Sequence, residues 1–248
     1  MDGGFVAIAD ISEAMNAIGA SNDYRLIGGV AVLLHVQRLG LDLPLRATGD
    51  ADFGVPPYLI RDHELVAAIE ALRYTKVAGN RWERPIDHRR VASVDLLIPA
   101  YTSRARHTRH VGDVVTTEVP GLAVALRRPA IAIPARFRLT SGDIRDATVA
   151  LPDPLSMLTL KALVRTVRHE DRDAQDLWRC LEVAAAEGVT PDIVDSEPEA
   201  VELRALLHRE LGPNGSSLDA ITGDLQTEPA ARLRTRIRSL LADVTGAL

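Results

Sequence analysis

Residues 24–55 read YRLIGGVAVLLHVQRLGLDLPLRATGDADFGV, and this stretch decides the fold. YRLI at 24–27 predicts a short strand, and Gly28 with Gly29 directly after it predicts a turn. The run 30–39 is apolar nearly all round, which is typical of a helix buried within a domain. A glycine turn between strand and helix lets the backbone approach a phosphate, and the free N–H groups of the helix N-terminus favour an anion there.

The end of this stretch, residues 48–55, alternates between two faces as a strand does. Asp50 and Asp52 therefore point the same way, together with Thr48. Two ionised carboxylates at i and i+2 need a counter-charge, and Mg²⁺ meets that need because it prefers hard oxygen ligands and bridges to substrate phosphates. A solvated strand face also explains an isolated D-x-D, but the glycine turn and the lead-in Arg46-x-Thr48 favour a metal site.

A third carboxylate belongs to the apolar run 91–98, which also has the alternation of a strand. Its apolar residues point to one face and Asp95 points to the other. If this strand neighbours the first, Asp95 joins Asp50 and Asp52 at one site. Further strands are predicted at 113–119, within 122–133 and at 146–151.

Composition and pattern divide the chain of 248 residues into two predicted domains. Residues 1–151 alternate between helices and strands, which predicts an α+β domain, whereas residues 152–248 are helical in pattern, which predicts a helical C-terminal domain. The net charge of −5 argues against coating nucleic acid by bulk attraction. No run approaches the roughly 18 apolar residues that span a bilayer, and the start lacks the basic residues of a signal peptide, so we expect a cytoplasmic protein.

The helical domain carries a basic stripe, formed by Lys161, Arg165 and Arg168 at i, i+4 and i+7. Asp173 and Asp176 lie one turn apart on the next predicted helix. Such a stripe suits the negative charge of a triphosphate, and the two carboxylates would either hold the lysine and Arg165 in place or contact the substrate. A surface face of ion pairs is the alternative explanation.

The order GG-V-A-x-L-L-H followed by R-x-T-x-D-x-D resembles the nucleotidyltransferase superfamily related to DNA polymerase β, and most closely its AbiEii/MenT-type toxin branch. The resemblance covers residues 24–185 and implies a mixed-sheet nucleotidyltransferase core with a C-terminal helical-bundle lobe, the two lobes enclosing a central cleft. The matching residues are Gly28, Gly29, Asp50, Asp52, Asp95, Lys161, Arg172, Asp173 and Asp176.

This resemblance implies an enzyme of the EC 2.7.7 type, which moves a nucleoside monophosphate (NMP) from a nucleoside triphosphate (NTP) to an acceptor hydroxyl with two Mg²⁺ ions. It makes Asp50, Asp52 and Asp95 the metal ligands, with Asp95 also reaching the acceptor hydroxyl as a general base. Lys161 joins them as a catalytic residue. The implied nucleotide-binding residues are Gly28, Gly29, Arg46, Thr48, Lys161, Arg165, Asp173 and Asp176.

By the same resemblance the acceptor is an RNA, the 3′ end of a tRNA, and the protein is a toxin with a cognate antitoxin protein as its partner. The arginine- and histidine-rich segment 101–110 would then hold an RNA backbone, although a solvated loop explains its composition equally well. Two alternatives stay open. The chain could modify a hydroxyl of a small-molecule antibiotic, or it could be a nucleotide-binding regulator without turnover. The three carboxylates favour an enzyme over a regulator.

Two reactive residue types lie inside predicted helices rather than in loops. Cys180, the single cysteine, sits in the helical pattern DLWRCLEVAAA, and His35 sits in the apolar helix 30–39. We expect both side chains to be buried in a core, with no role as nucleophile or ligand.

Overall fold

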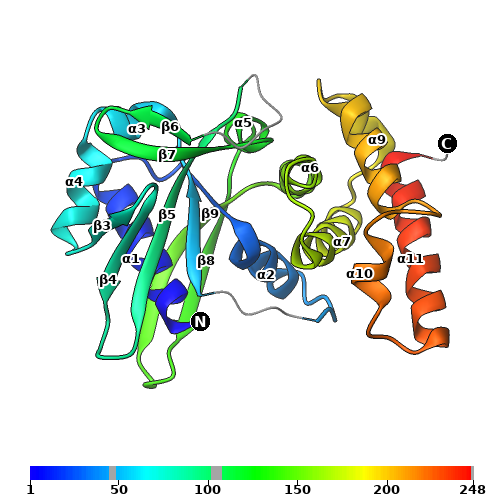
Figure 1. Ribbon diagram of the computed structural model, residues 1–248, viewed down its shortest axis with the longest axis horizontal. Helices are drawn as coiled ribbons and strands as arrows, with labels where there is room; N and C mark the ends of the chain where they lie inside the picture. Colours follow the sequence, from blue (N-terminus) through cyan, green and yellow to red (C-terminus); the bar gives the residue numbers. More distant parts are fainter. Residues whose placement is uncertain (45–48, 102–107, 247–248) are drawn as a thin grey trace. The chain divides into compact units, whose positions relative to one another are not determined.

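The computed structural model of the chain describes residues 1–44, 49–101 and 108–246 (Figure 1). The chain divides into two compact units. The first unit comprises Met1–Leu33 and the described residues from Gly49 to Asp153. The second unit comprises Leu34–Pro44 and the chain from Pro154 onward. Within the described residues, no helix is long and apolar enough to cross a membrane.

Seven of the described strands form a mixed sheet at the centre of the first unit (Figure 1). They are β1 (Arg25–Ile27), β2 (Asp50–Gly54), β3 (Thr75–Ala78), β4 (Arg81–Pro85), β5 (Val91–Pro99), β6 (Thr108–Val111) and β7 (Val114–Val119). The main path runs β1-β2-β5-β4-β3, and β7 pairs with the last residues of β5 and with β6. β5 is parallel to β2 and β7, and the other pairs are antiparallel. The predicted α+β class and mixed sheet are confirmed.

Helix α1 (Asp2–Ala17) packs against β5 of this sheet and against β9 of a separate two-stranded sheet. That second sheet is the antiparallel pair β8 (Ile131–Arg138) and β9 (Ile144–Leu151). The apolar stripe of α1 is fully buried, with Ile8 and Ile11 at 0% exposure. Each such side chain contributes about 2 kcal/mol on burial, so the stripe fixes the helix to the sheets.

Four further helices connect the strands. They are α2 (Gly28–Arg38), α3 (Pro57–Arg61), α4 (Glu64–Ala71) and α5 (Leu122–Arg127). Helix α5 occupies the first part of the segment 122–133, of which only the end is a strand. Leu122 explains this difference, because its side chain packs where Gly54 of β2 has no Cβ, and a helix turn delivers it there.

The second unit is helical from Pro154 onward (Figure 1). Its helices are α6 (Pro154–Val164), α7 (Asp171–Ala186), α8 (Pro191–Asp195), α9 (Ala200–Leu211), α10 (Leu218–Thr222) and α11 (Thr227–Thr245). Helix α7 is central, since it packs against α6, α10 and α11. It buries charged as well as apolar side chains, so these charges need partners within the unit. The central cleft expected from the sequence stays a prediction.

Candidate active site

Three carboxylates lie on one face of the large sheet. Along β2, Asp50 and Asp52 alternate with the buried Ala51 and Phe53, as the sequence pattern predicts. Asp95 of β5 is the direct cross-strand partner of Asp52 in the parallel pair. Because residues in register on neighbouring strands point to the same face, the fold brings together the three carboxylates predicted from the sequence.

The opposite face of β2 is covered by apolar packing. The ring of Phe53 contacts that of Tyr24, with 5.6 Å between centroids, and the Tyr24 hydroxyl donates a 3.0 Å hydrogen bond to Ser12 of α1. Burial raises the pKa of Tyr24, which keeps the hydroxyl protonated as this donor. The carboxylates therefore face away from α1, and the hydrophobic core on the α1 side fixes their strand without enclosing them.

Gly28 touches this site directly. It has a φ of +75°, and a Cβ placed on it would lie 2.1 Å from Oδ2 of Asp52. Glycine is therefore required twice, for the backbone conformation and for the close approach. Because α2 begins at Gly28, the positive end of that helix lies beside the Asp52 carboxylate, an arrangement that favours negative charge. Gly29 follows in the same first turn.

Arg81 is part of the site and was missed by the sequence reasoning. It lies on β4 directly opposite Asp95, and its guanidinium binds that carboxylate through two bonds, Nε to Oδ1 at 3.1 Å and Nη2 to Oδ2 at 2.6 Å. The same Nη2 also donates to Oδ2 of Asp50 at 3.0 Å. The hydrogen bonds to Asp95 raise the pKa of Arg81, so its positive charge is permanent. One arginine thus balances two of the three carboxylates.

Asn80 supports the same arrangement from the turn before β4. Its Nδ2 donates to Oδ1 of Asp95 at 3.1 Å, and its Oδ1 accepts a 3.2 Å bond from the Thr117 hydroxyl. Asp95 is therefore held by two side chains in addition to its strand. Asn80 and Arg81 follow Gly79 and form a polar pair in a hairpin. The sequence does not indicate which strand this hairpin neighbours.

The donors have the chemistry of Mg²⁺ ligands, since three carboxylates share one face of the sheet. Arg81 bonds to both Asp50 and Asp95 and so already supplies a cation there. Among the residues that the structure describes, no three metal-ligating side chains lie close enough together to hold a metal ion.

Two residues assigned from the sequence, Arg46 and Thr48, lie outside the described residues. The same holds for most of the arginine- and histidine-rich segment. From its end, Arg109 of β6 forms an ion pair of 2.9 Å with Glu118 and is half exposed.

The basic stripe of α6 is buried and paired within the second unit. Lys161 donates to Oδ2 of Asp176 at 2.9 Å, and the side chains are only 7% and 3% exposed. Asp176 also pairs with Arg179, whose Nε donates to the Pro44 carbonyl at 2.8 Å. The expectation that Asp176 holds Lys161 agrees with this contact. The network also ties α7 to the last described residue before the connection into β2.

The other two cations of the stripe have different partners. Arg165 donates hydrogen bonds of 3.1 Å to the Glu210 side chain of α9 and to the Glu170 carbonyl. Arg168 donates two hydrogen bonds to the Asp173 carboxylate, at 2.6 and 2.5 Å. Burial raises the pKa of Glu210, but hydrogen bonds from Ser217 and Arg209 and the charge of Arg165 outweigh it, so the pKa lies below its ordinary value. Glu210, 45 residues after Arg165, was not found from the sequence.

The two residues expected in the core are buried. Cys180 is 0% exposed, and burial raises the pKa of its thiol, so it stays protonated. His35 is also 0% exposed, with Nδ1 at 3.3 Å from the Arg38 guanidinium.

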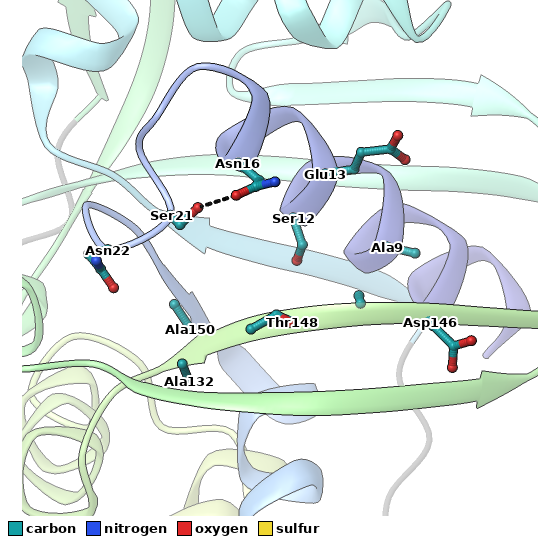
Figure 2. A pocket seen from close by; sticks show the side chains of 11 residues that line it. Ala9, Ser12, Glu13, Asn16, Ser21, Asn22, Ala132, Asp146, Thr148 and Ala150 are labelled. Atoms are coloured by element: carbon teal, nitrogen blue, oxygen red, sulfur yellow. Dashed lines mark hydrogen bonds between the residues drawn. The ribbon is translucent and has the colours of Figure 1, made fainter.

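A separate pocket of about 470 Å³ lies between α1 and the β8–β9 pair (Figure 2). Ser12, Glu13 and Asn16 of α1 face it from one side and Asp146 and Thr148 of β9 from the other. Most of this lining is exposed, and none of the residues assigned from the sequence belongs to it.

A glycine turn at a helix N-terminus can bind phosphate, and carboxylates on a neighbouring strand can hold cations beside it. The sequence pattern of the family described as nucleotidyltransferase matches residues 7–187, well over half of the chain. The chain belongs to the nucleotidyltransferase family, whose members are transferases that use an NTP as substrate. The resemblance seen in the sequence is thus confirmed at the level of this family.

Among solved structures, the chain is similar to the solution structure of ANT(2'')-Ia, an antibiotic-resistance factor with substrate-regulated conformation dynamics. The identity is 18%, the similarity covers 96% of this chain and 92% of that chain, and the TM-score is 0.30. No curated protein matches the chain.

Proposed function

We propose that this nucleotidyltransferase moves an NMP from an NTP to a hydroxyl of an RNA acceptor in a Mg²⁺-dependent reaction. One observation carries the proposal, namely the register that sets Asp95 opposite Asp52, with Asp50 on the same face and the Gly28 turn against it. Phosphoryl transfer depends mostly on positioning and on charge neutralisation, and this face supplies a rigid sheet for the first and carboxylates that would hold the neutralising cations for the second.

The roles of the residues follow from their places. Asp50 and Asp52 would hold the metal, and Asp95 would hold metal and accept the proton of the acceptor hydroxyl. The hydroxyl oxygen of the acceptor then bonds to the α-phosphorus of the NTP. The bond from that phosphorus to the oxygen that bridges to the β-phosphorus breaks, and pyrophosphate leaves. When bound, Mg²⁺ would neutralise the charge that develops on the attacking and leaving oxygens.

The triphosphate needs further contacts. Gly28, Gly29 and Thr48 would cradle the phosphates and Arg46 would support them, because backbone N–H groups at a helix start bind anions. Lys161 and Arg165 would neutralise the charge of the triphosphate. Asp173 and Asp176 would position these cations or contact the nucleotide. Since Lys161 and Arg165 are buried beside carboxylates, a direct contact requires them to exchange partners.

We further propose that the acceptor is the 3′ end of a tRNA and that the protein is a toxin held in check by a cognate antitoxin protein. This step rests on the resemblance of the GG and D-x-D motifs to the AbiEii/MenT-type branch and on the basic segment that follows β5. Arg109, half exposed at the end of that segment, has the charge and reach for an RNA phosphate.

The test incubates the protein with Mg²⁺, each NTP labelled at the α-phosphate, and either total tRNA or an aminoglycoside. We expect label on tRNA, lost in Asp52→Asn and retained in Asp219→Asn, a matched carboxylate whose side chain is 95% exposed and paired with Arg234. Label that persists in Asp52→Asn overturns the metal assignment. Label on the aminoglycoside alone selects a small-molecule enzyme, and binding of NTP without transfer selects a regulator.

A further inference from the structure

We propose that the pocket between α1 and the β8–β9 pair is a binding site for an aliphatic polyamine, a flexible methylene chain that carries several ammonium groups (Figure 2). This site goes beyond the proposed transfer reaction, because no residue of the carboxylate cluster lines the pocket. All of the lining residues belong to the first unit, so the site is complete within that unit.

The rim of the pocket is acidic. Glu13 of α1 and Asp146 of β9 lie on opposite walls, and the described residues that line the pocket include no basic side chain. Glu13 forms no ion pair with any other described residue. Asp146 pairs with Arg136, but their side chains are 63% and 72% exposed, and exposed pairs of this kind are weak. Both carboxylates are therefore open to a cationic ligand.

The floor of the pocket, in contrast, is small and buried. Ala9, Ser12 and Ala150 are only 8%, 6% and 3% exposed. The alanine methyl groups leave room above them and offer apolar surface to a methylene chain. Among the described residues, Ser12 makes one side-chain hydrogen bond, which it accepts from the Tyr24 hydroxyl. A second lone pair of the Ser12 oxygen is thus available to an N–H group of the ligand.

This arrangement selects a polyamine from among the possible cations. A metal ion needs several ligands that converge on one point, and no such group of side chains occurs in the described part of the chain. A polyamine instead separates its charges by methylene groups, as the pocket separates Glu13 from Asp146 by an apolar floor. The side-chain oxygens of Asn22 and Thr148 can accept further N–H groups. The volume of about 470 Å³ is typical of small-molecule sites.

Tyr24 connects the floor of the pocket to the large sheet. Its hydroxyl donates to Ser12 at 3.0 Å and accepts a 3.3 Å hydrogen bond from the backbone N–H of Ala150. Its ring contacts that of Phe53 on β2. A polyamine on this floor therefore touches the residues that pack behind β2. Because the ligand binds the folded chain, it should raise the temperature of unfolding.

The test titrates the full chain with spermidine by isothermal calorimetry, beside n-butylamine, which has one ammonium group. We expect one site that binds spermidine about tenfold more tightly than n-butylamine, because linked charges bind together. Glu13→Gln and Asp146→Asn should each weaken spermidine binding about fivefold. Ala132 lines the pocket opposite Ala150, so the ring of Ala132→Phe should fill the pocket and abolish binding. Thermal unfolding checks that each variant is folded.

The matched control is Glu228→Gln on α11, which removes an 80% exposed carboxylate outside the pocket and should leave spermidine binding unchanged. If Glu228→Gln weakens binding as much as Glu13→Gln, attraction to the net negative charge explains the effect and the inference is overturned. Undiminished binding to folded Ala132→Phe, or no binding of spermidine to the unaltered protein, overturns it as well. If Ala132→Phe does not fold, the comparison of Glu13→Gln with Glu228→Gln decides.

Discussion

The carboxylate cluster of the first unit and the ion-pair network of the second are built from the same residue types in opposite surroundings. Arg81 and Asp50 are 39% and 45% exposed, whereas Lys161 and Asp176 are 7% and 3% exposed. Exposed pairs contribute about 0–1 kcal/mol, so they exchange partners readily. Loss of one partner from a buried pair costs about 3–5 kcal/mol. The first cluster is therefore suited to binding, and the second holds the helices in place.

The largest effect is expected when a carboxylate of the first unit's cluster is changed. Asp95→Asn should lower NMP transfer on the order of 10³-fold, because it weakens charge stabilisation in the transition state and removes the proton acceptor. Both oxygens of Asp95 accept hydrogen bonds from Arg81 and Asn80, and the amide keeps only one oxygen for them, so the free energy of unfolding should fall by about 1–3 kcal/mol. Steady-state transfer and urea unfolding of the same preparation measure the two quantities. A loss of stability in step with the loss of activity would show that Asp95 acts structurally.

The second largest effect is expected when the buried ion-pair network of the second unit is broken. Glu210→Gln removes the charge that balances Arg165, and we expect it to lower the free energy of unfolding by about 3 kcal/mol. Transfer activity of the folded protein should fall far less than in Asp95→Asn. Urea unfolding gives the stability, and Arg232→Gln, which breaks an exposed pair with Glu228, is the control with an expected change below about 0.5 kcal/mol. Equal losses of unfolding free energy in the two variants would contradict the structural role given to the buried network.

A smaller effect is expected from alanine substitutions at two glycines that both have positive φ. Gly28→Ala meets the Asp52 carboxylate, whereas Gly40, with a φ of +62°, has open space around it. Each alanine should cost about 1–3 kcal/mol of backbone strain, and only Gly28→Ala should also impair transfer. Transfer assays on both variants test this. Equal activities would mean that the Gly28 contact with Asp52 has no part in catalysis.

The smallest effect is a pH dependence that belongs to the second unit. The pKa of Glu210 is lowered in the folded state, so its stabilisation is complete above the ordinary glutamate pKa of about 4.3 and is lost as the pH falls through the lower folded value. The stability difference between the unaltered protein and Glu210→Gln should therefore narrow below about pH 4. Urea unfolding at pH 7, 5, 4 and 3 measures it, and a constant difference would contradict the shifted pKa.

The sequence predicted those parts of the site that depend on local pattern. Alternation placed Asp50 and Asp52 on one face of β2 and Asp95 opposite the apolar face of its own strand, and the turn before α2 located Gly28. The pairing of β5 with β2, which puts Asp95 on the same face, was a condition that the pattern did not supply. It could not find Arg81, because strand alternation does not say that β4 pairs with β5 and sets Arg81 opposite Asp95.

The same limit applied to partners in the helical unit. The spacing of the basic stripe was visible, but Glu210 reaches Arg165 across 45 residues of chain, and only helix packing decides that contact. In α5, packing of Leu122 against Gly54 likewise outweighed a local preference for strand. Local periodicity thus predicted the elements, and long-range packing chose the partners of the charges.

The division of the chain has a consequence for its biosynthesis. Leu34–Pro44 belongs to the second unit, yet it leaves the ribosome more than a hundred residues before α6 and α7 exist. Its contacts there include the Pro44 carbonyl bonded to Arg179 and the Arg38 pair with Glu187 at 2.9 Å. During translation these contacts can therefore form only after α7 has been made. A fragment that begins at Pro154 would lack these contacts altogether.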